Sequence, residues 1–174
     1  VLIYKTERTM NDDVLNSLKA ERSEASKSHI MVIGVGGAGG NAVNHMFHLG
    51  IKDVDFMVCN TDQQALDISP VELKIRLGED GLGAGNDPAV GRRAAITSLD
   101  MVKQMFENYS TKMVFITAGM GGGTGTGASP VIAKAAREMG ILTVGIVTSP
   151  LKIEGHIRYK QAMAGIEEMK SCVD

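Results

Sequence analysis

The sequence of 174 residues contains no tryptophan, and aromatic residues make up only 4% of it. Cysteine is equally scarce. Cys59 and Cys172 lie far apart and form no CxxC pair, so we interpret them as ordinary half-buried thiols in a reducing cytoplasm. No apolar run approaches the roughly 18 residues of a membrane-spanning helix, and the amino end lacks the pattern of a signal peptide. We therefore expect no direct insertion into a membrane.

Neither sign of charge dominates. Eighteen lysines and arginines stand against 20 acidic residues, which gives a net charge of −2, and the two kinds are interspersed. This balance predicts neither a nucleic-acid groove nor a polybasic membrane patch. The hydrophobic fraction of 44% and the charged fraction of 22% are those of an ordinary soluble domain, and the length suits one domain with a real core.

Glycine is the residue in excess. The 21 glycines amount to about 12% of the chain, against a usual level of about 7%. They gather in three clusters, within residues 34–40, 78–85 and 119–127. Each cluster follows a short apolar run of the kind that predicts a strand.

Strands and helices are predicted to alternate after a polar, mobile arm over residues 1–28. Residues 1–9 precede the first methionine, Met10, and are either an artificial remnant or an upstream extension. Expected strands cover residues 29–34, 54–59, 71–77, 113–118 and 141–148. Expected helices cover residues 41–49 and 127–139, with one after Asp87-Pro88 and one near the carboxyl end. The alternation predicts an α/β fold, a Rossmann-like parallel sheet with helices on both faces and a ligand at the carboxyl ends of its strands.

The first glycine loop, residues 34–41, contains a GxGxxG pattern between a strand and a helix. Glycines there permit positive φ and let a phosphate approach the free N–H groups of a helix start. The pattern alone is weak evidence, because a tight turn with close helix packing would also produce it. It also suits a dinucleotide-binding fold in which Asp62, about 20 residues further on, binds a ribose.

The third loop, residues 121–127 with the sequence GGGTGTG, is more specific. Its backbone can form a concave nest of N–H groups, to which Thr124 and Thr126 add hydroxyl donors. No Lys-Ser or Lys-Thr follows, so it is not a P-loop. A polyphosphate held without that lysine must be neutralised by helix-start dipoles and a divalent cation. The middle loop, residues 78–88, is either a flexible surface connection or a lid over the terminal phosphate.

Two histidines offer only weak evidence for a metal site. His45 and His48 share a helix face at i and i+3, but no third ligand is evident in the sequence, so a surface or packing role is favoured.

Four stretches of the chain resemble the tubulin/FtsZ superfamily, and its bacterial cell-division branch in particular. They are residues 36–43, 59–62, 81–88 and 119–127, and their order and spacing hold across residues 29–174. GGGTGTG is the signature of that superfamily. The resemblance implies a GTP-binding domain over residues 29–174 that is incomplete at its carboxyl end.

The resemblance also implies individual roles. Residues of the first loop would contact the phosphates and sugar, those of the third loop would hold the β/γ-phosphate end, and Glu154 and Arg158 would bind ribose and phosphate. From the residues alone, that last pair would be a solvated charge pair at a helix start. The expected nucleotide-binding residues are Gly36, Gly37, Ala38, Gly39, Gly40, Asn41, Asn60, Asp62, Gly83, Ala84, Gly85, Asn86, Gly121, Gly122, Gly123, Thr124, Gly125, Thr126, Glu154 and Arg158.

By this resemblance, the ligands would be GTP or GDP, with magnesium held mainly through the phosphates. The function would be that of a filament-forming cytoskeletal GTPase that builds the bacterial division ring at mid-cell in the cytoplasm. Copies would stack head to tail, and membrane-tethering and regulatory division proteins would bind through regions outside this chain. The base-reading helix and the catalytic acids of the superfamily would follow Asp174, so no catalytic residue is expected here and the fragment alone should be nearly inactive.

Two departures from the superfamily pattern stand out. Leu151 and Ile153 occupy positions where the superfamily carries aromatics, and the acids Glu79 and Asp80 lie close to the expected terminal phosphate.

Three different functions stay open beside the GTPase. A Rossmann-type NAD-dependent oxidoreductase would leave GGGTGTG unexplained and would need a substrate domain. A non-enzymatic nucleotide-sensing or scaffold module would use the same phosphate-binding loops without turnover. An archaeal or plasmid-segregation member of the superfamily would share the fold and the signature.

Overall fold

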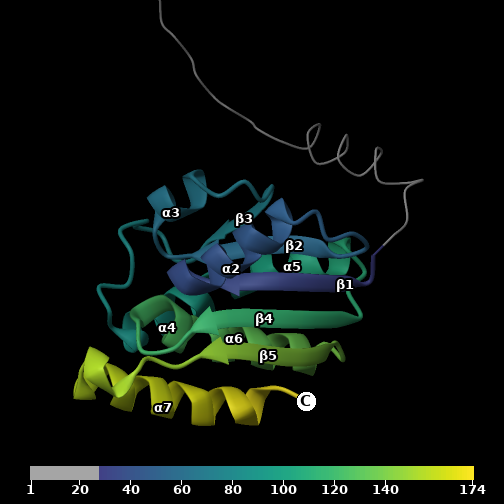
Figure 1. Cartoon of the computed structure of the whole chain (residues 1–174). Coiled ribbons are helices and arrows are strands. Elements are labelled where there is room, and N and C mark those ends of the chain that lie inside the picture. The colour runs from purple at the N-terminus through teal and green to yellow at the C-terminus, as the bar shows by residue number, and fades with distance from the viewer. Residues whose placement is uncertain (1–27) are drawn as a thin grey trace, which may run out of the picture.

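A computed structural model describes residues 28–174 (Figure 1). The predicted arm over residues 1–28 therefore lies outside the described residues, except for Ser28. The Ser28 hydroxyl donates a hydrogen bond to the Asp53 carbonyl oxygen at 2.7 Å, beside the first strand.

A single parallel sheet of five strands forms the centre of the fold, in the order β3-β2-β1-β4-β5. The strands are β1 (Ile30–Val35), β2 (Asp55–Asn60), β3 (Leu73–Arg76), β4 (Met113–Gly119) and β5 (Leu142–Thr148). The chain builds outward from β1 to β3, then returns to place β4 on the other side of β1, where Val35 pairs with Ala118. This reversal creates a switch point at the carboxyl ends of β1 and β4, which is where ligands bind in such sheets.

Helices cover both faces of the sheet, as predicted (Figure 1). On one face, Val32 and Val58 pack with Val43 of α2 (Gly36–His48) and Leu66 of α3 (Gln63–Asp67). The alternate residues face the larger core cluster, which includes Met31 and Ile116 of the sheet. Four helices contribute to that cluster: α4 (Pro88–Thr97), α5 (Leu99–Asn108), α6 (Gly123–Glu138) and α7 (His156–Cys172). Successive side chains of a strand point to opposite faces of the sheet, and both faces are covered by helices. The fold therefore has two apolar layers, one on each face.

Several predicted boundaries were wrong. The helices predicted at residues 41–49 and 127–139 begin at Gly36 and Gly123, because the glycine clusters form their first turns instead of loops. The helix predicted after Asp87-Pro88 is two helices, α4 and α5, separated at Ser98. The buried Ser98 hydroxyl accepts the Gly78 N–H at 2.9 Å, so this break anchors the base of the middle loop. The short helix α3, capped by Asp62, was not predicted.

The glycines of GGGTGTG let α6 approach its neighbours at main-chain distance. A Cβ at Gly125 would overlap the Gly119 carbonyl oxygen at the end of β4, and one at Gly127 would overlap the Pro88 carbonyl oxygen in α4. A Cβ at Gly123 would lie 2.9 Å from the Asp87 nitrogen. Backbone atoms cannot move aside as a flexible side chain can, so any side chain at these positions forces the helices apart. Three of the five glycines in the motif therefore have a packing role whatever ligand binds nearby.

This packing predicts that Gly127→Ala lowers the free energy of unfolding by about 3 kcal/mol, because the added methyl group overlaps α4. Urea denaturation of the variant and the wild-type chain measures the difference. Gly40→Ala is the matched control, because it also lies in a helix but a Cβ there meets no atom within 4 Å. The control should keep or slightly raise stability. Equal behaviour of the two variants would show that α6 and α4 are not in main-chain contact.

Candidate nucleotide-binding site

A cavity of about 370 Å³ opens at the switch point between β1 and β4. Its size falls within the range of about 300–1,000 Å³ that is usual for ligand pockets. The lining residues come from four segments that follow β1, β4 and β5: Val35, Gly37, Ala38, Gly119, Met120, Gly122, Gly123, Thr124, Gly125, Thr148, Ser149, Pro150, Glu154 and Arg158. The first and third glycine clusters, which are about 80 residues apart in sequence, thus meet in one site.

The first turn of α2 forms one wall. Gly36 has φ +73, a left-handed conformation that turns the chain directly from β1 into the helix, as glycine permits. Gly37 and Ala38 are exposed to the cavity, whereas Gly39 is buried against the backbone of Gly34 and Thr117. The N–H groups of a first turn have no acceptor within the helix, so this wall presents N–H donors and the positive end of the helix dipole.

The first turn of α6 forms the opposite wall. Gly121 has φ +101, and the helix begins two residues later. Thr124 is half-buried and lines the cavity. Thr126 does not line it: its side chain is buried, and its hydroxyl accepts the Gly121 N–H at 2.8 Å. Thr126 therefore holds the turn in shape from beneath, while the open face of the turn consists of residues 122–125.

The middle loop lies against the start of α6. The Gly83 N–H donates to the Thr61 carbonyl oxygen at 3.0 Å, and the Gln63 N–H donates to the Gly81 carbonyl oxygen at 3.0 Å. Ala84 and Asn86 lie beside Gly123 and Gly122 respectively, although neither lines the cavity. The structure therefore brings the expected residues 83–86 next to the third loop, at its outer edge. Glu79 and Asp80 are exposed in the same loop.

Glu154 and Arg158, the residues for which the resemblance implied contacts with ribose and phosphate, both line the cavity. Arg158 Nη1 lies 3.6 Å from Glu154 Oε2, and its aliphatic stem passes close to Gly121. Glu154 Oε1 accepts the Leu151 N–H at 2.8 Å, which closes the one-turn helix η1 (Lys152–Glu154). Leu151 and Ile153, at positions where the resemblance implied aromatics, are 70% and 90% exposed, so they do not pack this loop.

Five of the expected residues lie at a second, smaller cavity of about 50 Å³ beside the end of β2. Gly36, Gly40, Asn41 and Asn60 line it together with Gly37, which also lines the larger cavity. Asp62 lines neither cavity. Its carboxylate oxygen Oδ1 caps α3 by accepting the Gln64 N–H at 2.9 Å. This capping was missed from the sequence.

Sequence reasoning also missed three lining residues at the end of β5 and directly after it. Thr148, Ser149 and Pro150 contribute to the larger cavity. The available signal was their place at the carboxyl end of a predicted parallel strand, where ligand contacts gather. Thr61 was missed as well, although it adjoins the predicted Asn60 and Asp62. Its hydroxyl oxygen lies 2.7 Å from the hydroxyl oxygen of Thr124.

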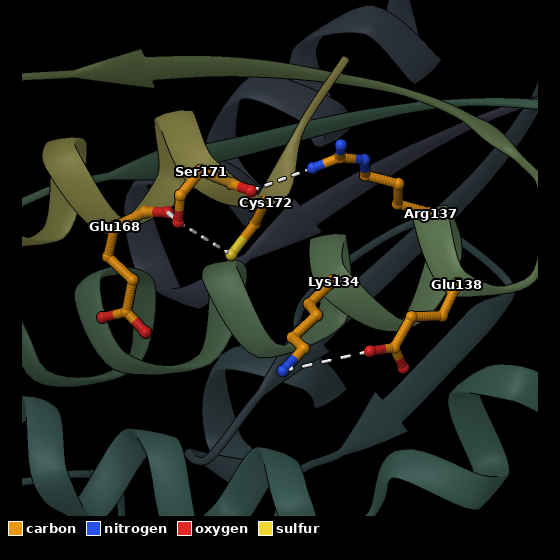
Figure 2. Close-up of a pocket in the computed structure, with 6 residues that line it drawn as sticks. All are labelled: Lys134, Arg137, Glu138, Glu168, Ser171 and Cys172. Atoms are coloured by element: carbon orange, nitrogen blue, oxygen red, sulfur yellow. Dashed lines mark hydrogen bonds and ion pairs between the residues drawn. The ribbon is translucent and has the colours of Figure 1, made fainter.

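A larger groove of about 530 Å³ lies elsewhere, between α6 and α7 (Figure 2). Its charged side chains are paired. Lys134 Nζ lies 3.9 Å from Glu138, Arg137 donates to the Ser171 carbonyl oxygen at 2.9 Å, and Glu168 pairs with Arg92 of α4. The hydrogen bond from Arg92 to Glu168 raises the pKa of the arginine above its ordinary value. With its charges already paired, this groove lacks the donor array that an anion requires.

No group of three or more potential metal-ligating side chains exists within residues 28–174. His48 instead makes a 2.7 Å hydrogen bond between its ring nitrogen Nδ1 and the Asn44 carbonyl oxygen. Over the same residues, no helix is long and apolar enough to cross a membrane.

Cys59 lies near the end of β2, in the lining of the smaller cavity, and is 1% exposed. Burial removes water from the thiolate form and raises the pKa of this thiol to about 12. The thiol is therefore neutral at physiological pH. A neutral thiol is neither a nucleophile nor a strong metal ligand, so Cys59 belongs to the core of the fold.

Comparison with known proteins identifies relatives of this arrangement. Residues 29–174 match the model of the Tubulin/FtsZ family, GTPase domain. The cell division protein FtsZ of Porphyromonas gingivalis is 55% identical over 148 residues, which are 83% of this chain and 32% of that protein. An empty FtsZ dimer from M. jannaschii has a TM-score of 0.80 at 38% identity and is matched over 95% of this chain and 48% of its own.

A second solved structure extends the comparison to an assembled relative. The GTPγS-bound protofilament of CetZ2 from Haloferax volcanii has a TM-score of 0.75 at 26% identity and is matched over 83% of this chain and 46% of its own. The chain thus spans about a third of the P. gingivalis protein and about half of each of the two solved chains.

The raised pKa of Cys59 predicts an alkaline loss of stability. The folded protein keeps its thiol proton between the ordinary value of 9.0 and about 12, whereas the unfolded chain releases it, so stability falls as pH rises through that window. Relative to Cys59→Ala, the wild-type free energy of unfolding should fall more steeply, by about 1.4 kcal/mol per pH unit. Urea denaturation across the window measures both slopes. Parallel slopes would mean that Cys59 is accessible to water.

Proposed function

Because the chain belongs to the Tubulin/FtsZ family and its residues 29–174 match the GTPase domain of that family, we propose that it binds GTP and GDP in the cavity between the first turns of α2 and α6. The observation that carries the proposal is that the first turns of α2 and α6 face the same cavity at the carboxyl ends of β1 and β4. Each offers N–H donors that lack acceptors in their own helix, and together they suit a di- or triphosphate.

The lining residues support a division of roles along the nucleotide. Residues 37–38 and 122–125 would surround the phosphates, with the Thr124 hydroxyl as an additional donor. Arg158 is the cation of the cavity lining and would offset phosphate charge, while Glu154 would accept from the ribose hydroxyls. Asn41 and Asn60 at the smaller cavity extend the polar surface beyond the first wall. Gly83, Ala84, Gly85 and Asn86 would approach the terminal phosphate as the outer edge of the site.

Magnesium is the cation we propose for the bound triphosphate. It prefers oxygen ligands and usually keeps several waters, so it does not need a cluster of protein carboxylates. One cationic side chain and two helix dipoles leave part of a triphosphate charge uncompensated, which a phosphate-bound divalent ion would neutralise. Asp62 lies near this edge of the sheet and could accept a hydrogen bond from a magnesium-bound water.

Exposed apolar side chains on the segments around the site support an assembly role for this end of the molecule. They are Ile68, Leu82, Leu151, Ile153 and Ile157, each at least 70% exposed. Apolar side chains that are removed from water on association stabilise a contact between proteins. We propose that a second copy of the protein covers these five side chains. The two copies would be arranged head to tail, a heterologous contact that repeats into a filament. The relatives solved as a dimer and as a protofilament support the proposal.

The whole protein would then act as a GTPase of the bacterial division ring, at the mid-cell division site in the cytoplasm. The relatives named cell division protein FtsZ support this role. Hydrolysis would be completed where a neighbouring subunit supplies the groups that position water, since binding alone does not provide them. Membrane-tethering and regulatory division proteins would act through regions outside residues 1–174.

Ligand choice separates a GTP-binding domain from an NAD-dependent enzyme. The 174-residue chain should bind GTP and GDP in the presence of magnesium in preference to NAD, because two phosphate-binding turns fit a polyphosphate. Asp62, the acid that would have to bind the ribose of NAD, caps α3 and does not line the cavity. Isothermal calorimetry measures the three affinities. Equal or tighter NAD binding would contradict the proposal, and loss of GTP binding without magnesium would support the role of the cation.

Turnover shows whether the catalytic groups lie within this chain. The chain alone should hydrolyse GTP very slowly, whereas a chimera joined to the part of the P. gingivalis protein that follows the matched region should hydrolyse it at a rate that rises with protein concentration. Phosphate release measures both rates. A full rate in the chain alone would place the catalytic groups within it and contradict the proposal.

The chimera also permits a control for assembly. Leu82→Ser removes an apolar side chain that is 89% exposed without adding charge. This variant should bind GTP normally but lose most of the concentration-dependent turnover, because the head-to-tail contact is weakened. Unchanged turnover would show that Leu82 is not part of the subunit contact.

A further inference from the structure

Thr61 lies where the loops after β2, β3 and β4 meet. Its side chain is 4% exposed, and its hydroxyl oxygen Oγ1 lies 2.7 Å from Oγ1 of Thr124 in the first turn of α6. Its carbonyl oxygen accepts the Gly83 N–H of the middle loop at 3.0 Å. One residue therefore contacts both of the neighbouring loops, through different atoms: the hydroxyl contacts Thr124, and the main chain contacts Gly83.

The Thr61–Thr124 hydrogen bond has two possible directions, with opposite consequences for an anion. A hydroxyl has one proton to donate and two lone pairs that accept. If Thr124 donates to Thr61, it presents only lone pairs to the cavity, which repel a phosphate oxygen. If Thr61 donates to Thr124, the Thr124 proton is free to point into the cavity. A bound anion therefore selects the second direction.

We propose that Thr61 is a positioning residue for nucleotide binding: it donates to Thr124 and thereby directs the Thr124 hydroxyl proton toward a phosphate oxygen. Thr61 does not line the cavity and would not touch the nucleotide. Consecutive hydrogen bonds of this kind polarise one another, so the Thr124 hydroxyl becomes a better donor as well as a better oriented one. The inference rests on the proposed function, because it requires a phosphate in the cavity.

Thr61→Val isolates this contact. Valine keeps the β-branched shape of threonine and leaves the Thr61 carbonyl bond to Gly83 in place, so the middle loop keeps its anchor. Thr61→Ser restores the hydroxyl. Thr143→Val is the matched control, because Thr143 is also fully buried and its hydroxyl donates to the Ile141 carbonyl oxygen at 2.8 Å, on β5 and outside the cavity lining.

The test measures the dissociation constant for GTP with magnesium and the free energy of unfolding without ligand, in the 174-residue chain and each variant. Thr61→Val should weaken GTP binding about fivefold, which corresponds to one ordinary hydrogen bond. Thr61→Ser should bind within about twofold of wild type on the same scale. Thr143→Val should lower stability but leave the affinity unchanged.

A double-mutant cycle gives a readout that a merely structural role would not change. In a Thr124→Val background, Thr61→Val should cause no further loss of affinity, because the hydroxyl that it orients is gone. Should Thr61→Val not fold, Thr61→Ala takes its place in every comparison.

The outcomes separate the inference from the proposed function. Wild-type chain that shows no saturable GTP binding overturns the proposed function. Wild-type binding with an unchanged affinity in Thr61→Val overturns the inference alone. Three other results would also overturn the inference. They are a loss of GTP affinity in Thr61→Ser as large as in Thr61→Val, the same loss in Thr143→Val, and additive losses of affinity in the double-mutant cycle.

Discussion

The approach of α6 to β4 and α4 without intervening side chains is the constraint on which the site depends. Gly125 meets the end of β4, Gly127 meets α4, and Gly123 meets the residue that caps α4. Because the contacts are between backbones, no side-chain rearrangement can make room there, and the start of α6 is held in place. The position of α6 in turn determines the position of the cavity. The middle loop that leads into α4 and the start of α2, whose Gly36 lies against Gly125, both pack against the start of α6.

The electrostatic character of the site comes mainly from the backbone. Two helix starts point their N–H groups into the cavity, while its lining contains one cationic and one acidic side chain, Arg158 and Glu154, which lie near each other. Backbone dipoles of this kind keep their direction when the ligand leaves, so little reorganisation is needed on binding. A site of this design tolerates changes in exposed side chains such as Leu151 and Ile153, but not in the glycines that pack the start of α6 against its neighbours.

Sequence reasoning predicted the parallel sheet, the two-sided helix cover and the convergence of the first and third glycine loops, because apolar periodicity and topology determine these features. It misplaced the starts of α2 and α6 by several residues. Glycine is a poor helix former, so propensity places Gly36 and Gly123 in loops, whereas tertiary packing holds them in helices. It also missed Thr61, since a hydroxyl pair that joins residues 63 positions apart leaves no local signal.

The pairing of β1 with β4 sets the order of events during synthesis. Ile30 lies opposite Met113, a separation of 113 − 30 = 83 residues, and this pair is the centre of the sheet. While the ribosome is still making β4, only the part of the sheet formed by β1, β2 and β3 can assemble, and one edge of β1 lies open. The cavity between α2 and α6 therefore cannot form before β4 and α6 have been made and β4 has covered that edge.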